Sequence, residues 1–95
     1  MLAVTVEVKI KPGKEAEFEQ IGRDASKVIE ANEPGNLFYR VYRMDDPQTY
    51  LIIERYKDQA ALDAHGASAH VAEISPRFQA VAAGDPVMNI YEEIE

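Results

Sequence analysis

The sequence contains no cysteine, which excludes disulfide bonds, thiol catalysis and zinc sites built on sulfur. It also lacks any run of the roughly 18 apolar residues that a membrane-spanning helix requires. Positive charge is scarce, because 10 Lys and Arg residues stand against 17 Asp and Glu residues, and the net charge is −7. No basic cluster along the chain offsets that charge, so we expect no nucleic-acid partner.

The start of the chain also lacks the pattern of a secretory signal peptide. Met1, Leu2 and Ala3 lead directly into alternating valine and charged residues, without a basic segment followed by an apolar one. We therefore expect a cytoplasmic protein that does not associate with a membrane. With 95 residues, the chain suits one domain, residues 1–95, that buries about two thirds of its unfolded surface.

Residues 2–11 alternate between apolar and polar side chains, which predicts a strand with one buried face. A proline and a glycine end this pattern. Apolar residues then recur at steps of three and four, which predicts an amphipathic helix that ends near residues 33–35. Residues 37–43 and 50–56 are rich in aromatic and branched side chains and are separated by turn residues, as in a β-hairpin.

Two further helices are predicted after the hairpin. Asp58 can cap a short helix that extends through His65, and Ser68 can cap another with its own apolar row. Pro76 is expected to kink or restart this last helix, because it has no backbone N–H to donate. Residues 87–91 supply a final strand. The order βαββαβ predicts an α+β, ferredoxin-like fold, with helices on one face of an antiparallel sheet.

The two-residue period of a strand also assigns the hairpin side chains to the two faces of the sheet. If Val41 faces Ile52, then Tyr39 faces Glu54 and Leu37 faces Tyr56. All six side chains then lie on the face that the helices cover. The opposite face carries Phe38, Arg40, Tyr42, Leu51, Ile53 and Arg55.

That opposite face is largely apolar, although the predicted helices can cover only one face of a four-stranded sheet. A second copy that stacks sheet to sheet would bury its apolar side chains, which are Phe38, Tyr42, Leu51 and Ile53. We therefore predict a homodimer through the sheet face.

Several segments suggest a family by their order and spacing. They are Lys11-Pro12-Gly13-Lys14-Glu15 with Phe18, Glu33-Pro34-Gly35-Asn36-Leu37-Phe38-Tyr39, Glu54-Arg55-Tyr56, and His65 followed by Ser68-Ala69-His70. Together they resemble the antibiotic biosynthesis monooxygenase domain family, nearly from end to end. The resemblance implies a dimeric α+β barrel, in which two subunits join their sheets and each keeps a small pocket between sheet and helices.

The resemblance implies a range of reactions rather than one. Similar proteins include quinol and polyketide monooxygenases that use dioxygen without metal or flavin, haem-degrading enzymes, and an isomerase of a phosphorylated autoinducer. The haem-degrading branch uses an Asn, a Trp and a His. This chain has Val6, His65 and Ser75 at those positions and contains no tryptophan. We therefore expect neither haem nor another cofactor.

His65 is the leading candidate for proton transfer, because imidazole gains and loses a proton near neutral pH. The alternative is a helix-end histidine that only caps or packs. Glu54 lies by strand parity on an apolar face, where a carboxylate must be paired, protonated or functional. It either orients His65 or a substrate hydroxyl, or it bonds a tyrosine or a backbone group.

His70 follows His65 by five residues, a spacing that does not place two ligands on one helical face, so we predict no metal site. A break between the helices at Gly66 would still allow the two rings to converge. Otherwise His70 is a mostly solvated residue of the first helical turn. The side chains that we expect to contact a substrate are Leu37, Tyr39, Ile52, Tyr56 and His70.

Three functions suit these residues. The first is a cofactor-independent monooxygenase that oxidises a small electron-rich aromatic, a quinol or a polyketide phenol, after His65 removes a hydroxyl proton. The second is an isomerase or lyase that acts on a small hydroxylated carbonyl compound with the same histidine and Glu54. The third is a noncatalytic dimer that binds a small ligand, which is favoured if Tyr39, Tyr56 and Phe38 fill the pocket.

Overall fold

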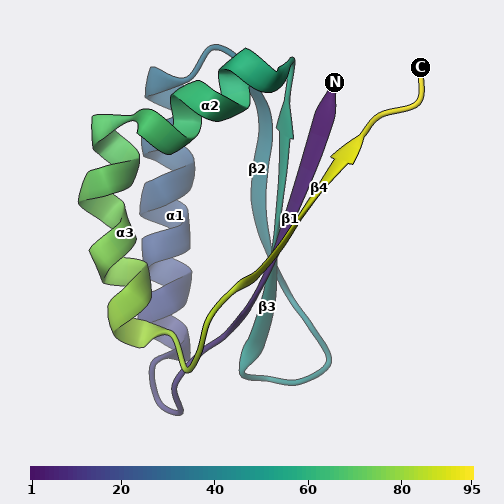
Figure 1. The fold of residues 1–95 in the computed structure, drawn as a ribbon. Helices are drawn as coiled ribbons and strands as arrows, with labels where there is room; N and C mark the ends of the chain where they lie inside the picture. The colour runs from purple at the N-terminus through teal and green to yellow at the C-terminus, as the bar shows by residue number, and fades with distance from the viewer.

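The computed structural model describes residues 1–95 and has a single four-stranded sheet with three helices (Figure 1). The elements are β1 (Leu2–Lys9), α1 (Glu15–Asn32), β2 (Asn36–Arg43), β3 (Thr49–Tyr56), α2 (Gln59–Ala67), α3 (Ala69–Val81) and β4 (Val87–Glu92). The strands are ordered β2-β3-β1-β4, and every neighbouring pair is antiparallel. This is the predicted ferredoxin-like arrangement.

The three helices lie on one face of the sheet, and no element covers the other face (Figure 1). The core fills the space between the two layers. Aromatic contacts in the core join α1 to β3 and to α3. The ring centroid of Phe18 lies 4.6 Å from that of Tyr50 and 5.7 Å from that of Phe78. None of the helices has the length and apolar character needed to cross a lipid bilayer.

The predicted caps define where the helices after the hairpin begin. The Asp58 carboxylate accepts a 2.8 Å hydrogen bond from the Ala61 N–H, and the Ser68 hydroxyl accepts one of 3.3 Å from the Val71 N–H. The predicted restart at Pro76 is wrong, because α3 continues through it to Val81. An exposed proline removes a single N–H donor, and the apolar row of α3 remains packed on the core.

The hairpin register confirms that Tyr39 faces Glu54 and that Val41 faces Ile52. The predicted pairing of Leu37 with Tyr56 is wrong. Asn36 pairs with Tyr56, and a β-bulge between Asn36 and Phe38 leaves Leu37 out of the ladder, with 46% of its surface exposed. Leu37 is therefore not part of the buried wall in which we placed it as a substrate contact.

The face without helices carries the apolar side chains that the alternation predicts. Leu51 and Ile53 are only half-buried there, and Tyr42 is 44% exposed. At the edge of the sheet opposite β2, every residue of β4 is exposed, including Tyr91. A sheet face of this kind is large and apolar for an isolated subunit.

Candidate functional site

Strand β3 brings a carboxylate into the buried layer. Its residues alternate strictly, so Tyr50, Ile52, Glu54 and Tyr56 all point toward the helices and are buried. Glu54 is only 6% exposed, and its Oε1 accepts a 2.5 Å hydrogen bond from the Tyr56 hydroxyl. The carboxylate is therefore satisfied by a tyrosine, which is one of the two possibilities that the sequence left open.

A second buried carboxylate belongs to Glu33, at the C-terminal end of α1. Glu33 is 9% exposed, and its backbone N–H donates to the Ile29 carbonyl to close the last helical turn. A negative charge is unfavourable at this end of a helix, and the last turn of α1 contains no basic residue. The carboxylate needs donors from elsewhere, and two histidines supply them.

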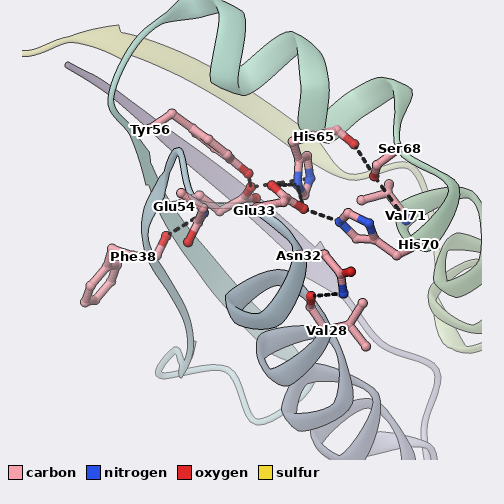
Figure 2. A network of polar contacts seen from close by, with 11 residues as sticks. Val28, Asn32, Glu33, Phe38, Glu54, Tyr56, His65, Ser68, His70 and Val71 are labelled. Carbon is pink, nitrogen blue, oxygen red and sulfur yellow. Dashed lines mark hydrogen bonds and ion pairs between the residues drawn. The ribbon is translucent and has the colours of Figure 1, made fainter.

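His65 and His70 both contact Glu33, although they belong to different helices (Figure 2). The Nδ1 of His65 lies 2.9 and 3.0 Å from the two Glu33 oxygens, and the Nε2 of His70 contacts Oε2. The chain turns between these helices at Ser68, whose hydroxyl also donates to the His65 carbonyl over 2.7 Å. This break lets two rings five residues apart converge on one group.

The contact with Glu33 determines which nitrogen of His65 is free. An ionised carboxylate only accepts hydrogen bonds, so Nδ1 carries the hydrogen and the lone pair of the neutral ring lies on Nε2. That nitrogen is 3.8 Å from Glu54 Oε1, and the ring packs against Tyr56 with 5.4 Å between centroids. His65 is thus held on one side and presents a basic nitrogen to the buried side.

Burial dominates the electrostatics of the buried side. It raises the pKa of Glu54 above the ordinary value, and the negative charge of Glu33 adds to this, while the Tyr56 hydroxyl and the charge that His65 carries when its ring is protonated oppose it. Burial also raises the pKa of Tyr56 and of Tyr39, helped in both cases by the charge of Glu54. The phenols are therefore neutral donors, and a proton on Glu54 is favoured more than in water.

The sequence analysis missed Glu33, although a signal was present. The buried row of α1 runs through Phe18, Gly22, Ala25 and Ile29, at steps of four, three and four. Glu33 is the next residue of that row, four positions after Ile29. A carboxylate that continues a buried helical row calls for partners inside the fold, as Glu54 does on its strand.

Apart from Leu37, the predicted substrate contacts on the strands lie where strand parity placed them. Tyr39, Ile52 and Tyr56 are buried on the helix-covered face. The solvated alternative for His70 is wrong, since its side chain is 18% exposed and bound to Glu33. Among the histidine, aspartate and glutamate side chains, no group of three or more is placed to hold a metal ion.

A surface cleft of about 390 Å³ lies beside the cluster. Glu33 and His70 belong to its lining, whereas His65 and Glu54 do not. The remaining lining residues are Asn32, Pro34, Gly35, Lys57, Asp58, Ala60, Ala61, Ala64 and Ser68. The solvent-facing end of the cluster is thus Glu33 with His70, and the inward end is Glu54 with Tyr56.

Comparisons with known proteins agree with this fold. Residues 1–77 match the family described as "Antibiotic biosynthesis monooxygenase". A Bacillus subtilis (strain 168) protein named "Putative monooxygenase YcnE" is 30% identical over 71 residues, which are 74% of each chain. A crystal structure from Caulobacter crescentus CB15, described as "a putative antibiotic biosynthesis monooxygenase", has a TM-score of 0.94 and 30% identity, over 99% of this chain and 90% of that one.

A conserved protein from Methanosarcina mazei Go1 is also similar in structure, with a TM-score of 0.90 and 28% identity. The match covers 98% of this chain and 92% of that one. The likeness therefore includes β4 as well as the segment that the family match covers.

Proposed function

This chain belongs to the antibiotic biosynthesis monooxygenase family, and from that membership we propose that it oxidises a small electron-rich aromatic with dioxygen and without a cofactor. The substrate class is a quinol or a polyketide phenol. The observation that carries the proposal is the geometry of His65, whose Nδ1 is bound by the buried Glu33 and whose Nε2 points to the interior. A histidine oriented by a carboxylate is the usual form of a general base.

In the proposed reaction, His65 Nε2 takes the proton of a substrate hydroxyl, and the charge of Glu33 stabilises the imidazolium that forms. The aromatic anion transfers one electron to dioxygen, and the two resulting radicals combine to form a carbon–oxygen bond. His65 then returns its proton to the outer oxygen of the peroxide, which gives a hydroperoxide. The O–O bond breaks, the outer oxygen leaves as water with the hydrogen of the same ring carbon, and the inner oxygen remains as a ring carbonyl.

Substrate access in this proposal depends on α2. Glu54 and Tyr56 are buried, so a ligand can reach His65 Nε2 only if a neighbouring element moves. Helix α2 carries His65 and has no fully buried residue, and segments with little buried apolar surface open at low cost. We expect α2 to open and close over the substrate.

The test is dioxygen consumption with a panel of hydroquinones. His65→Ala should lower the turnover rate by about 10²- to 10⁴-fold, the usual contribution of a general base. Gln59→Ala, an exposed change on the same helix, is the control and should retain the rate. Equal oxygen consumption by His65→Ala and the unchanged protein contradicts the proposal. Turnover without oxygen would instead identify the isomerase or lyase.

A noncatalytic binding role is the second candidate, and the packing of two tyrosines favours it. Tyr39 and Tyr56 are 6% and 0% exposed and share the helix-covered face of the sheet with Glu54, so both rings are packed in the interior. Phe38 does not contribute, because it lies on the face without helices. A protein with this role would bind hydroquinones with no oxygen uptake in any variant.

We also propose the homodimer through the sheet face, supported by the apolar residues that no helix covers. Sedimentation should give a dimer at micromolar concentration, and Ile53→Glu on that face should give monomers. A stable monomer of the unchanged protein would contradict this proposal. The cytoplasmic location and the lack of a nucleic-acid partner stay predictions from the sequence.

A further inference from the structure

His70 has a single polar partner in the structure, the carboxylate of Glu33. Its Nε2 contacts Glu33 Oε2, and its ring forms no hydrogen bond with Glu54 or Tyr56 (Figure 2). The side chain is 18% exposed and lines the cleft of about 390 Å³, whereas His65 does not line it. His70 therefore lies on the solvent side of Glu33, and His65 lies on the inner side.

The two imidazoles are the only side-chain donors to the Glu33 carboxylate. His65 Nδ1 lies almost equally far from both oxygens, at 2.9 and 3.0 Å, and Oε2 also accepts from His70. The carboxylate lines the cleft as well, where water competes for its oxygens. Without His70, no other donor of the chain holds Oε2, and the carboxylate is free to turn toward the cleft.

The orientation of Glu33 matters because His65 lies between two carboxylates. Its Nδ1 is 2.9 Å from Glu33 Oε1, and its Nε2 is 3.8 Å from Glu54 Oε1, which already accepts from Tyr56. A neutral imidazole has one N–H hydrogen, and the closer carboxylate takes it. If Glu33 turns away, Glu54 is the acceptor that remains. The hydrogen then moves to Nε2, and the inner side of the ring loses its lone pair.

We propose that His70 is a positioning residue for the general base. It holds Glu33 against Nδ1 of His65, which keeps the hydrogen of the neutral His65 ring on Nδ1 and the lone pair on Nε2. His70 acts through Glu33 and needs no contact with the substrate. Its effect on turnover rests on the proposed oxidation, whereas its effect on the His65 ring exists without any substrate and can be measured separately.

The helices that carry the two histidines suit this division of roles. Helix α3 carries His70 and has Val81 buried, with Ile74 and Phe78 packed on the core, whereas α2 has no buried residue. When α2 opens for a substrate, His65 leaves Glu33, and His70 stays bound to it. The carboxylate is therefore already oriented when His65 returns.

Substitutions at His70 can keep or remove the donor to Glu33. The amide nitrogen of glutamine lies as many bonds from Cα as Nε2 of histidine does, so His70→Gln still reaches Glu33. The asparagine side chain is one bond shorter, and His70→Asn loses the contact. His70→Ala has no donor and should behave like His70→Asn, so the test does not depend on one variant folding. Gln79→Asn, an exposed change on the same helix, is the control.

The first measurement is the position of the hydrogen on His65, from NMR of the isotope-labelled ring nitrogens. The chain has two histidines, so His65 gives the only imidazole signals in each His70 variant. At about pH 9, where ordinary imidazoles are neutral, the hydrogen should lie on Nδ1 in the unchanged protein, in His70→Gln and in Gln79→Asn. In His70→Asn and His70→Ala it should lie on Nε2 in most molecules. A hydrogen that stays on Nδ1 in both of these variants, or that lies on Nε2 in the unchanged protein, overturns the proposal.

The second measurement is dioxygen consumption with hydroquinones. His70→Asn should lower kcat about tenfold with KM unchanged, because the substrate still binds but fewer molecules present a lone pair on Nε2. His70→Gln should retain kcat. An equal loss of kcat in His70→Gln shows that His70 carries protons rather than holding Glu33, and a loss of stability alone in His70→Asn shows a merely structural role; either result overturns the proposal. If the unchanged protein consumes no dioxygen, the proposed oxidation fails, and the NMR comparison decides the role of His70.

Discussion

Glu33 holds two imidazoles in the buried layer, so replacing it with glutamine should destabilise the protein more than any surface change. Glutamine keeps one acceptor oxygen but removes the charge, and its NH₂ group can bond the other imidazole only after that ring shifts its hydrogen to the opposite nitrogen. Hydrogen bonds to a charged group contribute about 1.5 to 3 kcal/mol, and both histidine side chains are less than one fifth exposed. We expect Glu33→Gln to lower the free energy of unfolding by about 2 kcal/mol.

For a domain of this size, that loss lowers the melting temperature by roughly 8 to 16 °C. The measurement is urea unfolding followed by circular dichroism, with all variants at one protein concentration because association would shift the transition. Glu30→Gln, an exposed glutamate on the same helix with no ion pair, is the matched control and should stay within about 0.5 kcal/mol. The reasoning is refuted if Glu33→Gln and Glu30→Gln are equally stable.

Two further predictions follow from buried groups. Burial raises the pKa of Glu54 above its ordinary value of 4.5, so the folded state holds a proton that the unfolded state has already released. The free energy of unfolding of the protein, compared with that of Glu54→Gln, should therefore be greatest below about pH 4.5 and fall as the pH rises through the folded pKa of Glu54. Unfolding curves of both proteins, recorded across this pH range, measure the difference. A difference in unfolding free energy that stays constant or rises with pH contradicts the prediction. Gly35→Ala should lower the free energy of unfolding by about 1 to 3 kcal/mol, because the new Cβ would meet the Ala61 Cβ at 2.5 Å. Unchanged stability of this variant would contradict the prediction and would show that α2 can shift away from Gly35 without loss of stability.

Much of the fold could be predicted because its signals are local. The alternation in residues 2–11 and 50–56, the helical period of α1 and the two caps at Asp58 and Ser68 each depend on neighbours a few positions apart. Strand parity alone placed Glu54 and Tyr56 in the buried layer, since side chains on a strand must alternate between faces. The bulge at Leu37 escaped prediction, because one extra residue in a ladder leaves no periodic trace.

With Leu37 as the exception, the sequence by itself determined on which face of the sheet the hairpin side chains lie. It could not determine which faces meet at the ends of elements, because that depends on how far α1 extends and where the chain turns between α2 and α3. Packing brought Glu33 from one helix to the histidines of two others. Periodicity fixes direction within one element, whereas the site and the cleft require distances between elements that only tertiary packing sets.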